Sequence, residues 1–92
     1  MKILRTVKDL KEFTLSLKNE GKTVGLVPTM GALHAGHISL VDRAVADNDA
    51  TIVSVFVNPT QFNNPADLAT YPRNEQADFE LIEKANATAV FA

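Results

Sequence analysis

The polypeptide has 92 residues, of which 46% are hydrophobic and 22% charged, and its formal net charge is −2 at pH 7. This composition is ordinary for a soluble globular protein, no apolar run is long enough to span a membrane, and the lack of a basic excess argues against nucleic acid as a partner. Without cysteine, disulfides and thiolate metal sites are excluded. Charges throughout residues 1–13 leave no secretory signal, so we expect a cytoplasmic protein.

The first element expected is a helix. Thr6 is a suitable N-cap and Gly21 is placed to end the helix. Between them, hydrophobic residues recur at helical spacing, namely Val7, Leu10, Phe13 and Leu17. Residues 23–27, TVGLV, then read as a short buried strand.

A second helix is expected from about Gly36. Its apolar face would hold Ile38, Val41, Ala44 and Val45, with Asp42, Arg43 and Asp47 off that face. Residues 50–57, ATIVSVFV, are rich in β-branched side chains and are typical of a strand covered on both faces.

A long loop, residues 58–73, separates this strand from a third helix. The three prolines of the loop keep it from being helix or strand throughout. Asn74 could cap the third helix, whose apolar residues are Phe79, Ile82 and Ala85. Residues 88–92, TAVFA, begin a third strand.

The alternation of helices and strands predicts an α/β fold. We expect the first half of a Rossmann-like open parallel sheet with helices on both faces, because right-handed crossovers join parallel strands in this way. Residues 1–92 would then be the amino-terminal part of a nucleotide-binding domain, with the far edge of the third strand uncovered. By itself such a piece should fold marginally, associate with itself and lack activity.

The stretch VPTMGALHAGHISLV, residues 27–41, contains the two histidines of the chain. Their spacing puts His34 and His37 on one side of a helix start, beside N–H groups that have no intrahelical partner. The positive end of the helix and imidazole N–H donors favour a phosphate there. Gly31 could adopt a positive φ in the turn, and Gly36 would let a nucleotide approach the backbone. Because ligands bind outside the carboxyl ends of parallel strands, we expect His34, His37, Asn58 and Gln61 at that edge.

Other readings of these residues stay open. A histidine pair at this spacing can bind metal, although no third ligand lies nearby in the sequence. Either histidine could instead only cap or pack, and the glycines could serve only as turn residues. Gln61 could be an exposed loop residue without a function.

Three motifs together resemble one family. The stretch PTMGALHAGHISLV, followed by SVFVNPTQF and then YPR, is similar to the amino-terminal part of the pantoate–β-alanine ligases, or pantothenate synthetases. HAGH alone would indicate only the wider nucleotidylyltransferase superfamily with its H-x-G-H motif, which includes class I aminoacyl-tRNA synthetases. The two longer motifs narrow the resemblance. It implies that a closing loop over ATP and a carboxyl-terminal domain lie beyond residue 92.

The resemblance implies a reaction in which ATP and pantoate give pantoyl adenylate, and β-alanine then displaces AMP to form pantothenate. ATP would be a substrate accompanied by Mg²⁺, and the complete enzyme would be a cytoplasmic homodimer without a nucleic-acid or membrane partner. His34 and His37 would be catalytic through the ATP phosphates. The implied ATP-binding residues are Met30, Gly31, Ala32, Leu33, His34, Ala35, Gly36 and His37. The implied pantoate-binding residues are Gln61, Asn58, Met30 and Pro28.

Two other functions compete with this reading. A different nucleotidylyltransferase could use the same phosphate-binding turn on another substrate. The motif FVNPTQF argues against this alternative. A non-catalytic α/β binding module, in which the histidines are structural, is the second alternative. Nucleotide binding would separate the module from both enzymes.

Overall fold

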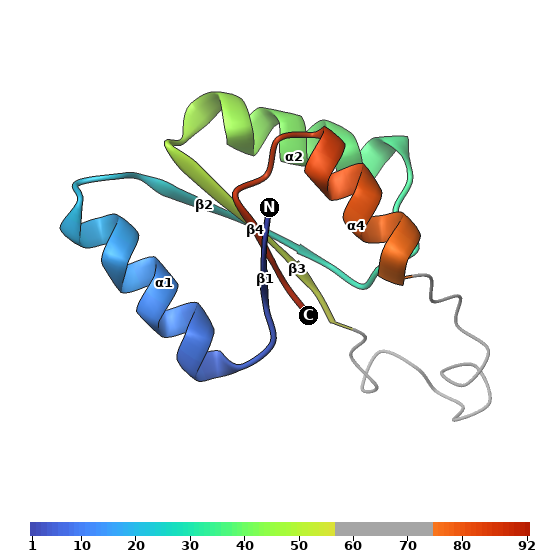
Figure 1. The fold of residues 1–92 in the computed structure, drawn as a ribbon. Coiled ribbons are helices and arrows are strands. Elements are labelled where there is room, and N and C mark those ends of the chain that lie inside the picture. The colour runs from blue at the N-terminus through green and yellow to red at the C-terminus, as the bar shows by residue number, and fades with distance from the viewer. Residues whose placement is uncertain (57–74) are drawn as a thin grey trace, which may run out of the picture.

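A four-stranded parallel sheet organises the molecule (Figure 1). The structure is a computed structural model and describes residues 1–56 and 75–92. The strands lie in the order β1-β4-β3-β2 and every neighbouring pair is parallel. Their bounds are Lys2–Leu4 for β1, Val24–Thr29 for β2, Ala50–Val55 for β3 and Ala89–Phe91 for β4. The helices are α1 (Val7–Asn19), α2 (Ala35–Asp47) and α4 (Glu75–Lys84).

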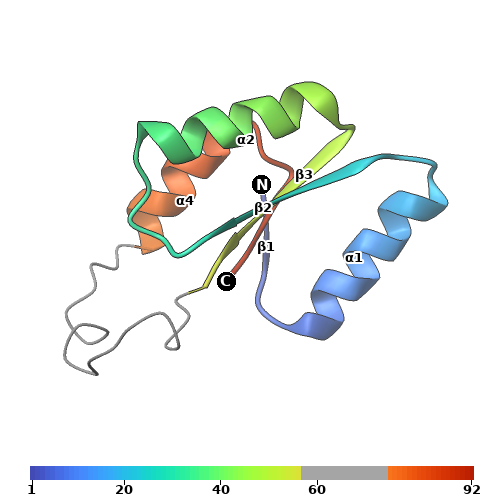
Figure 2. The same ribbon diagram turned by 180° about the vertical axis from the view of Figure 1, so that it is seen from behind.

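Helices cover both faces of the sheet, as predicted. Figures 1 and 2 show α1 on one face and α2 with α4 on the other. The core under α2 and α4 consists of Val27, Val41, Val53, Ile82, Ala85, Ala87 and Val90. The smaller core under α1 consists of Leu4, Ile52 and Ala89, with Leu10, Phe13, Val24 and Phe91 packed against it. Strand β3 contributes to both cores, which explains its nearly continuous apolar sequence.

The helix signals of the sequence act as expected. Thr6 Oγ1 accepts a hydrogen bond from the Asp9 N–H at 3.1 Å and so caps α1, and Gly21 follows the helix with φ 78°. In α2, Val41 is fully buried, whereas Asp42 and Arg43 are exposed. The proposed cap Asn74 and the loop 58–73 lie outside the described residues.

The amino terminus corrects one prediction. We expected a helix as the first element, but β1 precedes it and pairs with β4, with Lys2 opposite Ala89 and Leu4 opposite Phe91. The far edge of the last strand is therefore covered, and β1 and β2 are the edge strands of the described sheet. A segment of three residues is too short to show a strand pattern in the sequence. What stabilises β1 is its pairing with β4 and the burial of Leu4.

Parallel pairing brings the strand ends that matter to one edge. Val24 lies opposite Ala50 and Thr29 opposite Val55, so β2 and β3 end side by side at the same edge of the sheet. Strand β3 ends at Val55, two residues earlier than predicted, and Phe56 is exposed. Among the described residues, no helix is long and apolar enough to cross a membrane.

Candidate functional site

The turn between β2 and α2 runs from Met30 to His34 and contains two consecutive left-handed residues. Gly31 has φ 84° and Ala32 has φ 51°. A positive φ is easy for glycine but costs a residue with a Cβ about 1–3 kcal/mol, so the surroundings must hold Ala32 in place. The positive φ predicted for Gly31 is confirmed.

A buried carboxylate holds this turn. Asp78, in the first turn of α4, is only 4% exposed. Its Oδ2 accepts the Ala32 N–H at 3.0 Å and its Oδ1 accepts the Leu33 N–H at 2.9 Å. Each carboxylate oxygen thus has a backbone donor, which offsets the cost of burying the charge.

Thr29 supports the turn from the strand side. Its hydroxyl donates to the carbonyl oxygen of Ser54 at 2.9 Å and accepts the Gly31 N–H at 3.3 Å. This residue is buried, and it links the end of β2 both to β3 and to the turn. Thr29 thus holds the start of the turn and Asp78 holds its end, directly before His34.

The two histidines cap α2 reciprocally. The Gly36 N–H donates to His34 Nδ1 at 3.1 Å, and the His34 N–H donates to His37 Nδ1 at 3.2 Å. The ring centroids are 4.0 Å apart and the rings are tilted by 41°. Because each Nδ1 accepts a hydrogen bond, each neutral ring carries its proton on Nε2. Both histidines lie at the carboxyl edge of the sheet, as predicted.

The hydrogen bonds leave a defined set of donors at this helix start. Most backbone N–H groups are used inside the turn and the cap, namely those of Ala32, Leu33, His34, Gly36 and His37. The N–H group of Ala35 meets no acceptor within residues 1–56 and 75–92, and neither do the two Nε2–H groups. An anion placed here would meet these N–H donors and the positive end of α2.

Gly36 is required by the His34 ring. A Cβ at this position would lie 2.9 Å from His34 Cε1 and 3.2 Å from His34 Nδ1. The missing side chain therefore lets the imidazole fold over the first turn of α2. Close approach of a nucleotide, the reason predicted for this glycine, stays a prediction.

The remaining predicted site residues are only partly described. Pro28 lies exposed near the end of β2, and Met30 is half-buried at the start of the turn. Asn58 and Gln61 lie outside the described residues, so their position at the same edge stays a prediction. Within the described ranges, no three His, Asp or Glu side chains are grouped as a metal site would require.

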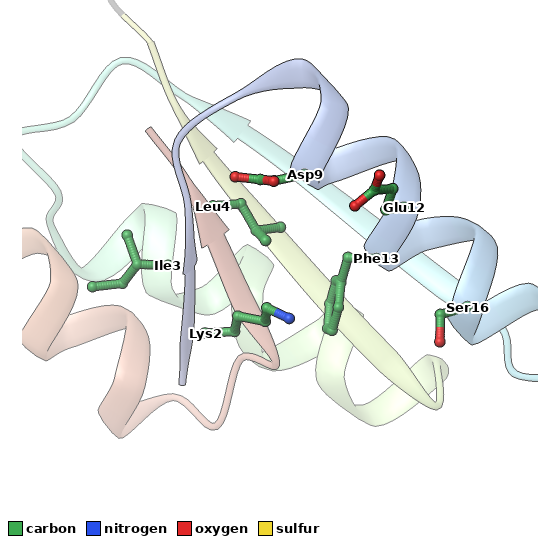
Figure 3. Close-up of a pocket in the computed structure, with 7 residues that line it drawn as sticks. All are labelled: Lys2, Ile3, Leu4, Asp9, Glu12, Phe13 and Ser16. Atoms are coloured by element: carbon green, nitrogen blue, oxygen red, sulfur yellow. The ribbon is translucent and has the colours of Figure 1, made fainter.

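Figure 3 shows a separate hollow between β1 and α1, at the other side of the sheet. Its volume is about 350 Å³, and its charged residues are Lys2, Asp9 and Glu12. Two carboxylates against one ammonium group disfavour a phosphate. The hollow is therefore a poorer candidate for binding an anion than the histidine turn.

Asp78 is the site residue that our sequence reasoning missed. A signal for it exists: Asp78 and Ile82 lie four residues apart on one face of α4, and Ala85 follows the helix directly. Ile82 and Ala85 both belong to the core. A carboxylate on the buried face of a helix needs a polar partner, but the sequence does not say which one.

Comparison with known proteins identifies the family. The sequence model of the family described as pantoate-beta-alanine ligase matches residues 2–92. The chain belongs to the pantoate–β-alanine ligase family. The resemblance inferred from the three motifs is thereby confirmed.

Curated members of the family match over the whole chain. The pantothenate synthetase of Phocaeicola vulgatus is 63% identical over 92 residues, which are 100% of this chain and 33% of that protein. The pantothenate synthetase of Thermotoga neapolitana is 50% identical over 91 residues, covering 99% of this chain and 32% of that protein. The chain thus spans about a third of the length of these relatives.

Solved structures of the pantoate–β-alanine ligase family share the fold. The ligase of Francisella tularensis, solved in complex with beta-gamma ATP and beta-alanine, superposes with a TM-score of 0.91 at 46% identity. The alignment covers 99% of this chain and 34% of the other. Pantothenate synthetase from Thermus thermophilus superposes with a TM-score of 0.83 at 41% identity, over 100% of this chain and 32% of the other. The Rossmann-like α/β architecture predicted from the sequence is confirmed.

Proposed function

We propose that the protein containing these residues condenses pantoate with β-alanine at the expense of ATP, through a pantoyl adenylate, and releases AMP and pyrophosphate. Membership of the pantoate–β-alanine ligase family supports this reaction. A relative with 46% identity was solved with an ATP compound and beta-alanine, which supports ATP and β-alanine as substrates. Residues 1–92 would be the amino-terminal part of its nucleotide-binding domain.

The observation that carries the proposal is the donor set at the start of α2. Two Nε2–H groups, from His34 and His37, lie beside the N–H group of Ala35. These donors are directed and are fixed in place by the reciprocal cap. Such donors stabilise charge that develops on phosphate oxygens without taking part as nucleophiles.

In the first step a carboxylate oxygen of pantoate would attack the α-phosphorus of ATP. The bond from the α-phosphorus to the bridging oxygen breaks, and pyrophosphate leaves with that electron pair. The residues of the turn would hold the phosphate oxygens while negative charge moves between them.

In the second step the amine of β-alanine would attack the acyl carbon of the adenylate. The bond from that carbon to the phosphate oxygen breaks, AMP leaves, and the nitrogen loses a proton to give the amide. Exclusion of water would protect the adenylate from hydrolysis between the two steps.

The other site assignments belong to the same proposal. Gln61 and Asn58 would hydrogen-bond pantoate, and Met30 and Pro28 would border its pocket. The N–H groups of Ala32 and Leu33 are engaged by Asp78, so any contact of these residues with ATP would use other atoms. Mg²⁺ would enter with ATP, because phosphate oxygens and water are the ligands it prefers. A cytoplasmic homodimer is the assembly that the family resemblance implies.

Exchange of labelled pyrophosphate into ATP tests the first step alone. The complete polypeptide that contains residues 1–92 should catalyse this exchange when pantoate is present and β-alanine is absent. Adding β-alanine should then release AMP and pantothenate. Exchange that depends on a different acid would favour another nucleotidylyltransferase, and nucleotide binding without any exchange would favour a binding module.

Histidine substitutions test the donor set. His34→Ala or His37→Ala should slow the exchange on the order of 100- to 1000-fold, which corresponds to about 2.7–4 kcal/mol for one lost donor. Loss of a cap should lower the free energy of unfolding by only about 1 kcal/mol. Asp42→Asn, on the exposed face of α2, is the matched control and should leave the rate unchanged. Full exchange activity in both histidine variants would contradict the assignment.

A further inference from the structure

Asp78 is placed where α4 meets the turn that carries the histidines. It lies 46 residues from Ala32 and 45 from Leu33 in sequence, yet its oxygens accept both of their N–H groups, at 3.0 and 2.9 Å. The carboxylate is 4% exposed and lies at the positive end of α4. It accepts the N–H groups of Ala32 and Leu33, so these two donors are already used and are not available to a phosphate.

The geometry of the turn depends on this carboxylate. Ala32 has φ 51°, a conformation that it would leave if its N–H lost its acceptor. There is little room for a different arrangement, since a Cβ on Gly31 would lie 3.2 Å from Asp78 Oδ2 and 3.3 Å from Val55 Cγ1. Asp78 therefore fixes two successive peptide groups directly before His34.

The position of His34 determines the histidine cap. Its backbone N–H orients the His37 ring and its own ring accepts the Gly36 N–H. A change in the direction of the chain at Leu33 would move both Nε2–H groups together. We infer that Asp78 is a positioning residue for adenylate formation, which it sets through the backbone of Ala32 and Leu33 without touching the substrate. This inference rests on the proposed function.

Asp78→Asn is the sharpest test because it keeps the shape of the side chain. Its amide oxygen can accept one of the two N–H groups, while its NH₂ group faces the other donor. In the complete polypeptide, kcat for pyrophosphate exchange with pantoate should fall on the order of tenfold to a hundredfold, as expected for donors displaced by about 1 Å. The KM for ATP should change far less, because the Ala35 N–H and the positive end of α2 remain.

A spectroscopic measurement separates positioning from loss of folding. In the unsubstituted protein, histidine ¹⁵N shifts should report the Nε2–H tautomer for both rings, and the amides of Ala32 and Leu33 should be protected from hydrogen exchange. In Asp78→Asn, one of these amides should lose protection and the tautomer should become mixed. Glu80→Gln, on the exposed side of the same helix, should alter none of these quantities.

A second variant changes the turn itself and not the carboxylate that holds it. Ala32→Val leaves Asp78 in place but puts a β-branched residue where φ is positive, so it should also lower kcat. Full exchange activity in folded Asp78→Asn, or in Ala32→Val if Asp78→Asn does not fold, would overturn the inference. If the unsubstituted protein shows no pantoate-dependent exchange, the proposed function fails first, and amide protection at Ala32 and Leu33 still distinguishes that result from failure of the turn geometry.

Discussion

Two buried threonines in the sheet, Thr29 and Thr51, differ in the hydrogen bonds of their hydroxyl groups. Thr29 Oγ1 donates to Ser54 and accepts from Gly31. Thr51 is 1% exposed, and its Oγ1 has no hydrogen-bond partner among the described residues. A buried hydroxyl without a partner keeps its desolvation cost, whereas a bonded one offsets it. The same substitution at the two positions should therefore have opposite effects.

Thr51→Val should raise the free energy of unfolding by roughly 1 kcal/mol, because it removes an unpaired polar atom at nearly constant volume. Thr29→Val should lower it by about 1–3 kcal/mol, because both hydrogen bonds of the buried Thr29 hydroxyl are lost. Urea unfolding of the two variants and the unsubstituted protein measures both changes. A destabilising Thr51→Val would mean that its hydroxyl is bonded in solution.

Gly36→Ala tests the reason for a glycine in the first turn of α2. An alanine inside a helix normally stabilises it by about 0.5–1 kcal/mol relative to glycine. Here the added Cβ would lie 2.9 Å from His34 Cε1, so the ring must move and the cap is lost. The lost cap, worth about 1 kcal/mol, should offset this gain, so we expect little net change in the free energy of unfolding but an altered ¹⁵N shift for His34 Nδ1. A variant of higher stability with unchanged histidine shifts would show that the ring has room.

At the scale of elements, β1 is the strand that forms only through its contacts with the rest of the fold. Leu4 is 1% exposed and belongs to the core under α1, whereas its neighbour Ile3 is 47% exposed. Arg5 continues from β1 to an ion pair with Glu75, the first residue of α4. The Arg5 guanidinium also lies 5.5 Å from the centre of the Phe79 ring. The amino terminus thus contacts the helix that carries Asp78.

Leu4→Ala should lower the free energy of unfolding by about 2–5 kcal/mol, since it opens a cavity beneath α1. Ile3→Ala is the matched control and should cost much less, because most of that side chain is already in water. Chemical unfolding monitored by circular dichroism compares the two. Equal costs would contradict the pairing of β1 with β4 in this register.

At the scale of the whole molecule, apolar surface remains exposed at the carboxyl edge on the α1 side. A hollow of about 310 Å³ there is lined by Leu10, Leu26, Ser54, Val55, Phe56, Phe91 and Ala92. Leu26 is 63% exposed and Phe56 is 68% exposed. β2, which carries Leu26, is also a strand with a free edge in the described sheet. Exposed apolar surface next to a free strand edge favours association.

Residues 1–92 expressed as a separate polypeptide should therefore self-associate as concentration rises. Phe56→Ser should weaken this association, whereas Leu40→Ser, on the outer side of α2 and 60% exposed, should not. Sedimentation velocity across a range of concentrations measures the effect. A clean monomer at all concentrations, or equal effects of the two substitutions, would contradict this role of the hollow. The predicted cause of self-association changes accordingly. The edge of β4 is covered by β1, and the strand with a free edge that lies beside this hollow in the described sheet is β2.

The sequence by itself determined the features that depend on neighbouring residues. Helical spacing identified the buried face of α2 around Val41, the cap at Thr6 followed from a single side chain, and the alternation of elements required a parallel sheet. Once the strands are parallel, their carboxyl ends share an edge, and so the placement of His34 and His37 there followed as well.

The tertiary structure alone decided the features that join distant residues. β1 exists because Leu4 pairs across to Phe91, and three residues carry too little pattern to predict a strand. The left-handed Ala32 and the buried Asp78 each look unfavourable when considered alone. They stabilise each other across 46 residues, since the carboxylate needs buried donors and the turn needs an acceptor. Local sequence patterns report a segment's own preferences, but such a pair is specified only when the fold brings its two members together.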